Sequence, residues 1–274
     1  IMPNLDQFFT NDDVAENCIQ MLNLDEYDLA VEPSAGSGSF YNKIGIKKIG
    51  VDLDPKVDGI IKQDYLNFKP PTSDKVLVIG NPPFGKNSSL AIKFFNHSCY
   101  ADTIAFIVPK TFRKPSVINR LNKNYTLREE VSLPLDSFHT PDGKSYPVPC
   151  VWQVWDKLKD NGKRPKVETV KSHQDFKFVD NIAAADFMIQ RVGAGAGATH
   201  KNFHKSKSSH YLLKASDEVY QKMKDILWDY KDSPKFDTAG NPSISKHDLI
   251  TKYMKTYHCD FHEYQPPATL EQFF

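Results

Sequence analysis

The feature that most constrains the fold is a series of seven short apolar segments before residue 160. They are YDLAVEP, IKKIGVDLDP, GIIKQDYLNF, DKVLVIG, DTIAFIVPK, REEVSLPL and PVPCVWQVWDKL. Apolar residues at helical spacing lie between some of them, as in SLAIKFFNHSCY. Strands that alternate with helices predict an α/β fold with a mostly parallel sheet and helices on both faces. Because only a loop joins the last two segments, we expect them to form an antiparallel hairpin at one edge of the sheet.

A polar segment, DKLKDNGKRPK, marks a boundary between two domains. We place the domains at residues 1–160 and 161–274. The second contains two stretches with amphipathic helical spacing, ASDEVYQKMKDILWDY and KHDLITKYMKTY. We therefore expect a smaller C-terminal α+β extension behind the large sheet domain.

Composition excludes several classes of protein. The chain is 40% hydrophobic and 25% charged, as expected for a globular protein, and no apolar run approaches the roughly 18 residues of a membrane span. The N-terminal segment IMPNLDQFFTNDD holds no basic stretch followed by an apolar one, so we expect no secretory signal. The four cysteines, Cys18, Cys99, Cys150 and Cys259, form no CxxC pair. We expect an intracellular protein, cytoplasmic or nuclear, without a bound metal.

The first apolar segment runs into a glycine loop, EPSAGSGSF, in which Gly36 and Gly38 let the backbone turn sharply and approach a ligand. Acidic residues end the next two segments, Asp52 in VDLD and Asp64 in QDYL. A carboxylate at the first position can accept hydrogen bonds from both ribose hydroxyls, and one at the second from an adenine amino group. Each acid alone is equally consistent with a solvated strand end. Together they indicate an adenosine-containing ligand, and the absence of GxGxxG and GK[ST] disfavours pyrophosphate.

The fourth apolar segment ends in Asn81-Pro82-Pro83-Phe84. EPSAGSGSF, VDLD, QDYL and NPPF, in this order, resemble the class I S-adenosylmethionine-dependent methyltransferases that methylate N6 of adenine, over residues 7–157. The upstream QFFTNDDVAENCI resembles the cofactor-covering segment of DNA adenine methyltransferases, and the order is similar to the gamma-type arrangement. The resemblance implies a Rossmann-like seven-stranded sheet, S-adenosyl-L-methionine as cofactor, and target recognition by the C-terminal extension.

The resemblance also implies how NPPF acts. The side-chain oxygen of Asn81 and the backbone carbonyl of Pro82 would accept the two amino hydrogens of adenine and aim the nitrogen lone pair at the methyl group. Phe84 would stack on the base, which must be flipped out of a duplex or be unpaired already. We expect a second aromatic on the opposite side and take Phe138 as the candidate, with Tyr146 behind it. A hydrophobic loop anchor explains Phe138 equally well.

For the cofactor, the resemblance implies a set of contacts around the glycine loop. Gly36 and Gly38 would lie beneath the methionine and the ribose, Glu32 near the amino group, Asp52 at the ribose hydroxyls and Asp64 at the adenine. Asn81 would border the same site. Thr10, together with Phe9 in the covering segment, would contact the methionine carboxylate.

Two basic stretches suit a nucleic-acid partner, although the net charge is only +1. The first contains Lys110, Arg113, Lys114, Arg120, Lys123 and Arg128 and no acid between residues 106 and 128. The second contains His200, Lys201, His204, Lys205, Lys207, His210 and Lys214, interleaved with two aromatic residues. We take Lys110, Arg113, Lys201 and Lys205 as candidate phosphate contacts. A solvated basic loop is the alternative for each stretch.

Four functions remain open. Methylation of DNA is our first choice because of the covering segment and the C-terminal extension, and RNA is the runner-up because NPPF also occurs in similar families that act on ribosomal, spliceosomal or cap-adjacent adenosine. A protein glutamine amide is a third substrate, although that family's motif usually ends in tyrosine. An inactive methyltransferase fold that serves as a binding subunit is the fourth. The C-terminal LEQFF resembles part of a sliding-clamp-binding peptide, or it packs on its own domain.

Overall fold

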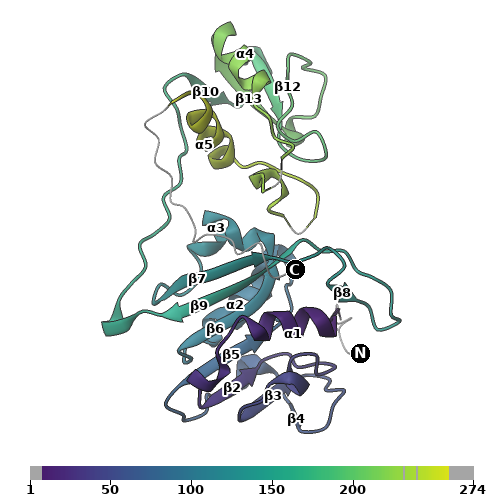
Figure 1. Ribbon diagram of the computed structural model, residues 1–274. Coiled ribbons are helices and arrows are strands. Elements are labelled where there is room, and N and C mark those ends of the chain that lie inside the picture. Colours follow the sequence, from purple (N-terminus) through teal and green to yellow (C-terminus); the bar gives the residue numbers. More distant parts are fainter. Residues whose placement is uncertain (1–7, 231, 239, 259–274) are drawn as a thin grey trace. The chain divides into compact units, whose positions relative to one another are not determined.

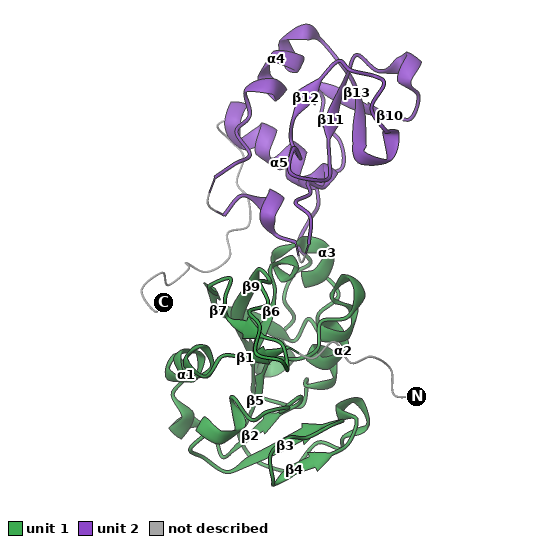
Figure 2. Cartoon of the chain, turned by 90° about the vertical axis from the view of Figure 1, so that its right-hand side faces the viewer, with its two compact units in different colours: residues 1–166, 266–274 green, residues 167–265 purple. Residues whose placement is uncertain are grey.

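The computed structural model describes residues 8–230, 232–238 and 240–258. The described residues up to Lys166 form one compact unit (unit 1), and those from Val167 onward form a second (unit 2), as Figure 2 shows in two colours. In the described part of the chain, no helix has both the length and the apolar character that crossing a membrane requires. The LEQFF tail and Cys259 lie outside the described residues.

Unit 1 is built on a seven-stranded sheet with the strand order β4-β3-β2-β5-β6-β9-β7. Its strands are β2 (Leu29–Glu32), β3 (Lys48–Asp52), β4 (Ile60–Lys62), β5 (Val76–Gly80), β6 (Thr103–Pro109), β7 (Tyr125–Ser132) and β9 (Cys150–Lys157). The first five in this spatial order pair in parallel, whereas β9 runs antiparallel to both β6 and β7. The predicted Rossmann-like α/β fold with an antiparallel edge hairpin is therefore confirmed.

Helices cover both faces of this sheet, as Figure 2 shows for α1 (Asp12–Gln20) and α2 (Ser89–His97) on opposite sides. Alternating strand residues explain the two layers, because neighbours along a strand face opposite ways. Leu77 and Ile79 of β5 pack in one buried cluster with α1. On the other face, the ring of Phe95 in α2 meets the edge of Trp155 at 5.5 Å and 82°. A short third helix, α3 (Pro115–Ile118), follows β6.

The described part of unit 1 has six 3-10 turns, and the crossover from β2 to β3 contains one of them and no α-helix. The turns are η1 (Leu24–Glu26), η2 (Tyr41–Lys43), η3 (Tyr65–Asn67), η4 (Lys86–Ser88), η5 (Lys110–Arg113) and η6 (Lys159–Asn161). The crossover from β2 to β3, which carries the glycine loop, thus lacks the α-helix that strict alternation predicts. Glycine and serine are weak helix formers, and residues 34–39 consist largely of them.

A two-stranded ribbon joins the N-terminal segment to the loop between β7 and β9. Here β1 (Phe9–Thr10) pairs antiparallel with β8 (Phe138–His139), with Thr10 opposite Phe138. Asn11 strengthens the junction, because its Nδ2 donates to the carbonyl of Asp136 at 2.6 Å and its Oδ1 lies 2.7 Å from Nδ1 of His139. The covering segment is therefore fixed to a loop more than a hundred residues away.

Unit 2 is α+β, as predicted. Its antiparallel sheet has the order β10-β13-β11-β12, formed by β10 (Phe176–Val179), β11 (Phe187–Gln190), β12 (Thr199–His200) and β13 (His210–Ala215). Two helices, α4 (Asp217–Asp225) and α5 (Lys246–Tyr257), pack against the sheet through one apolar cluster that includes Phe187, Met223 and Tyr253 (Figure 1). The 3-10 turns are η7 (Ile182–Ala184), η8 (Lys207–Ser209) and η9 (Pro234–Phe236).

Candidate functional site

The predicted site residues of unit 1 follow the carboxyl ends of four neighbouring strands. Glu32 ends β2, Asp52 ends β3, Asp64 comes shortly after β4, and Asn81 directly follows β5. Because these strands are parallel, their carboxyl ends share one edge of the sheet. Open α/β sheets bind ligands beyond this edge.

The glycine loop requires its two glycines. Gly36 has φ +43° and Gly38 φ +84°, and a Cβ on Gly38 would lie 2.7 Å from Nδ2 of Asn42. The loop also fixes Asp52, whose Oδ2 accepts the N–H of Gly36 at 2.8 Å while its Oδ1 accepts the N–H of Asp54 at 2.7 Å. The carboxylate is therefore held against the loop, and each oxygen keeps capacity for another donor.

Glu32 is a buried carboxyl group with an unused oxygen. Its side chain is 3% exposed, and Oε2 has no hydrogen-bond partner among the described residues. Burial raises the pKa of Glu32 well above its ordinary value, against the opposing effect of a hydrogen bond from the backbone of Tyr41. Gly80 makes room for it, since a Cβ there would lie 3.1 Å from Cγ of Glu32. Such an oxygen can accept from an ammonium group of a ligand.

Asn81 is held by two hydroxyl groups. Its Nδ2 donates to Oγ1 of Thr10 at 3.2 Å, and its backbone carbonyl accepts from Oγ of Ser34 at 2.9 Å. Its Oδ1 is buried and has no partner among the described groups. Fixing the nitrogen of an amide also fixes the direction of its oxygen, so Asn81 presents an oriented acceptor. Ser34 lies inside the glycine loop, but nothing in the sequence distinguishes it from the other serines there as a contact of Asn81.

Asp64 has a structural contact of its own. It caps η3, because its Oδ1 accepts the N–H of Leu66 at 2.9 Å, and its Oδ2 lies 3.4 Å from Nδ2 of Asn67. The carboxylate is half-buried. It can take a further hydrogen bond from a ligand only in addition to these contacts.

The aromatic residues are arranged differently from the prediction. Phe84 is half-buried and packs on the apolar cluster of α1, as do Phe8 and Tyr146, whose rings stack at 3.7 Å and 11°. Phe138 is only 2% exposed and belongs to that cluster itself. Its ring therefore offers no open face to a base in this structure, which favours the loop-anchor interpretation. Phe9 lies over the glycine loop, with its Cε1 3.3 Å from the Cβ position of Gly36.

The two cations of unit 1 that were predicted to contact phosphate, Lys110 and Arg113, have different surroundings. Arg113 is 14% exposed, and its Nε donates to Oε1 of the buried Glu130 at 2.8 Å while its Nη2 donates to Ser132 at 2.9 Å. Arg113 therefore neutralises a buried carboxylate, and the prediction that it contacts phosphate is not supported. Lys110 is half-buried and has no ion-pair partner among the residues described.

In unit 2, the basic residues gather around a cavity of about 330 Å³ that the sequence did not reveal. Arg191, Lys207 and Lys246 line it together with the ring of Tyr211, and none of the three forms an ion pair with a described carboxylate. His210 also lines the cavity; it is 8% exposed, and its Nε2 has no described partner. Asp180 also lines the cavity, so the three cations leave a net positive charge there, which attracts anions.

The two lysines chosen in unit 2 lie outside this cavity lining. Lys201 pairs with Asp217 at 2.8 Å, and Lys205 is exposed. Arg191 and Lys246 lie outside the predicted stretch: Arg191 directly follows β11, and Lys246 is the first residue of α5.

No family model matches the chain. It is 27% identical over 154 residues to proteins named rRNA adenine N-6-methyltransferase from Streptococcus sanguinis, Escherichia coli and Enterococcus faecalis. The match covers 48% of this chain and 62% of each relative. The chain thus matches less than two thirds of the length of these relatives.

Solved structures give weaker similarities. A dimethyladenosine transferase from Plasmodium falciparum is 16% identical, with a TM-score of 0.39 over 57% of this chain and 65% of that one. The M protein of the type I restriction enzyme EcoKI is 14% identical, with a TM-score of 0.43 over 93% of this chain and 71% of that one. Both scores lie below 0.5, so the fold of unit 1 rests on its own strand order.

Proposed function

We propose that the chain is an S-adenosyl-L-methionine-dependent methyltransferase that methylates the exocyclic N6 of adenine in DNA. One observation carries the proposal: Oδ1 of Asn81 is a buried acceptor without a described partner, on a side chain oriented by Thr10. It lies at the ligand-binding edge of the sheet, next to the glycine loop. The similarity to proteins named rRNA adenine N-6-methyltransferase supports the same chemistry.

The residues at this edge fit the cofactor. Oε2 of Glu32 lacks a donor, and the α-ammonium group of S-adenosyl-L-methionine would supply one. Asp52 would bind the ribose hydroxyls, and the glycine loop keeps the space that a Cβ would fill. Thr10 would lie beside the methionine part, and Asp64 beside the adenine. When bound, the cofactor supplies an electrophilic methyl group on a positively charged sulfonium.

The protein's part in the reaction is alignment. The N6 lone pair of adenine is delocalised into the ring, so the nitrogen is a poor nucleophile. Oδ1 of Asn81 and the carbonyl of Pro82 would accept its two hydrogens and turn the lone pair toward the methyl group. Phe84 would stack on the base, a contact typically worth about 1–3 kcal/mol. This chemistry requires positioned acceptors and no proton relay.

DNA and RNA place different demands on the site. In duplex DNA the target adenine must be flipped out, whereas an unpaired RNA base is already accessible. The covering segment, fixed to Asn81 through Thr10, supports DNA because it matches the resemblance to DNA adenine methyltransferases. The names of the curated relatives favour RNA as the second candidate. The cationic cavity of unit 2 would suit phosphates of either polymer.

The test is methyl transfer from labelled cofactor to matched adenine-containing DNA and RNA oligonucleotides, followed by digestion to nucleosides. We expect N6-methylated deoxyadenosine from the wild-type protein. Asn81→Ala should lower kcat by about 10²–10³, as removal of a preorganised hydrogen-bonding group does elsewhere. Its affinity for S-adenosylhomocysteine should stay within severalfold of wild type. Asn23→Ala, at an exposed asparagine before β2, is the matched control.

Either of two outcomes would contradict the proposal. Full activity of Asn81→Ala would remove the role of the amide oxygen. Failure of the folded, cofactor-binding protein to methylate adenine in either polymer would remove the enzymatic function itself. Methylation confined to RNA would replace the first candidate substrate by the second.

A further inference from the structure

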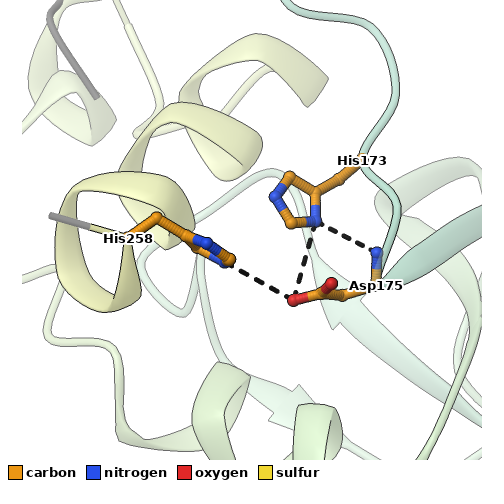
Figure 3. A group of neighbouring side chains, drawn as sticks. All are labelled: His173, Asp175 and His258. Carbon is orange, nitrogen blue, oxygen red and sulfur yellow. Dashed lines mark hydrogen bonds and ion pairs between the residues drawn. The ribbon is translucent and has the colours of Figure 1, made fainter. Parts of the chain in front are cut away.

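Two histidines and an aspartate that belong to none of the predicted sites converge in unit 2. His173 and Asp175 lie just before β10, and His258 directly follows α5. Figure 3 shows the three side chains pointing toward one another. Nδ1 of His173, a carboxylate oxygen of Asp175 and Nε2 of His258 all lie within 4.8 Å of one another. These are the donor atoms that borderline divalent cations prefer.

The separations between these atoms are wrong for hydrogen bonds. Oδ2 of Asp175 lies 3.8 Å from Nδ1 of His173 and 3.5 Å from Nε2 of His258. An N–H···O hydrogen bond measures about 2.7–3.2 Å. Around a tetrahedral Zn²⁺ with bonds of about 2.0–2.2 Å, neighbouring donor atoms lie roughly 3.3–3.5 Å apart. The two measured separations are close to this value, so a small movement of the side chains would bring all three donor atoms to bonding distance of one cation.

Surrounding contacts fix the orientation of His173 and Asp175. The ring of His173 stacks on Phe176 at 5.2 Å and 18°, and it meets the edge of Tyr253 at 5.2 Å and 74°. Oδ2 of Asp175 accepts a hydrogen bond from the hydroxyl of Tyr253 at 2.8 Å. Nδ1 of His173 accepts the backbone N–H of Asp175 at 3.2 Å, and a cation bound at Nδ1 would replace this hydrogen bond. Metal-binding side chains are typically oriented by such partners.

We propose that His173, Asp175 and His258 bind one divalent cation of the zinc class. The cation would join the segment before β10 to the end of α5, and so connect the beginning and the end of the described part of unit 2. Metal binding that needs the folded site adds to folding stability. The three side chains leave one position of a tetrahedral ion to water, and the expected effect on stability does not depend on methyl transfer. The three ligands form no CxxC or HxxxH pair, because they come from opposite ends of the unit, so the sequence does not predict the site.

The experiment uses the full chain, stripped with a chelator and titrated with zinc chloride. We expect calorimetry to show one Zn²⁺ bound per chain, and thermal melting to show a Tm that rises with zinc. Asp175→Asn keeps the size of the side chain and an acceptor for Tyr253, and His258→Asn changes a residue at the end of a helix. Each should weaken zinc binding at least tenfold, in line with the loss of a metal ligand. His204→Asn, at an exposed histidine of the same unit, should bind zinc like the wild type.

Three results would overturn the proposal. The first is a Tm that does not change with zinc, and the second is equal zinc affinity in the wild type and in folded Asp175→Asn. The third comes from the wild-type chain with Co²⁺ in place of zinc: a visible absorption spectrum as weak as that of the aqueous ion. The Co²⁺ spectrum needs only the wild-type chain, so it decides the question even where a variant fails to fold.

Discussion

Glu32 gives the sharpest prediction, because its burial should weaken folding while its charge strengthens cofactor binding. The side chain is 3% exposed, and burial raises its pKa well above the ordinary value. Between the unfolded and the folded pKa, the folded chain binds more protons than the unfolded chain. The free energy of unfolding therefore falls as the pH rises above about 4.3, the usual glutamate pKa. Glu32→Gln removes this titration with almost no change in shape.

Glu32→Gln should stabilise the folded chain but weaken cofactor binding, and the size of each effect follows from a different interaction. Each pH unit between the two pKa values of one group changes the free energy of unfolding by about 1.4 kcal/mol. The variant should thus gain stability relative to wild type as the pH rises through that window. A hydrogen bond to a charged group contributes about 1.5–3 kcal/mol, so its loss should lower cofactor affinity roughly 10- to 150-fold.

Urea titrations of wild type and Glu32→Gln from about pH 5.5 to about pH 8.5 measure the first effect. Calorimetry with S-adenosylhomocysteine measures the second, and buffers of different ionisation enthalpy reveal the proton released when Glu32 ionises on binding. Glu26→Gln, at an exposed carboxyl group, is the matched control and should leave both quantities unchanged. Parallel stability curves for wild type and Glu32→Gln, or equal ligand affinity, would refute the reasoning.

Two further predictions concern residues whose surroundings the structure specifies. Phe138→Ala should lower the free energy of unfolding by about 3–5 kcal/mol, because the ring is 2% exposed in the apolar cluster that includes α1. A raised KM with unchanged stability in urea would instead support a role of Phe138 in stacking on the target adenine. Lys207→Gln with Lys246→Gln should weaken oligonucleotide binding and reduce the slope of log K against log salt by about 0.9 for each lost phosphate contact, measured by fluorescence anisotropy. An unchanged salt slope would exclude the cavity from phosphate binding.

The strands of unit 1 were predictable because each one follows from a local apolar pattern. Their boundaries were less so, since β7 begins at Tyr125, before the predicted segment REEVSLPL. The ribbon of β1 and β8 was not predictable, because each strand has only two residues. It exists through contacts such as Asn11 with His139, between segments that are unrelated in sequence.

The candidate site likewise has residues whose position was predictable from the sequence and residues whose surroundings were not. Glu32, Asp52 and Asn81 come to one edge because each ends or follows a parallel strand, and that much is a consequence of the predicted topology. Burial is not readable from the letters of a loop, so the sequence leaves Phe138 open between a stacking residue and a loop anchor. The charge of Arg113 was visible, whereas its neutralisation by Glu130 from the neighbouring β7 was not.

A sequence motif therefore identifies a functional side chain, but it does not identify the residues that hold this side chain in position. NPPF identifies the amide of Asn81, but an amide on a loop can turn, and an acceptor that turns cannot aim a substrate. The hydroxyl of Thr10, in the covering segment, opposes this turn by accepting from the side-chain nitrogen. The hydroxyl of Ser34, in the glycine loop, donates to the backbone carbonyl and so holds the loop itself. Both segments were expected to bind the cofactor. Since they also hold the asparagine, under the proposed function the oxygen that would bind the target depends for its position on the same loops that would surround the methyl donor. Alignment of the two reactants would then be coupled through Thr10 and Ser34.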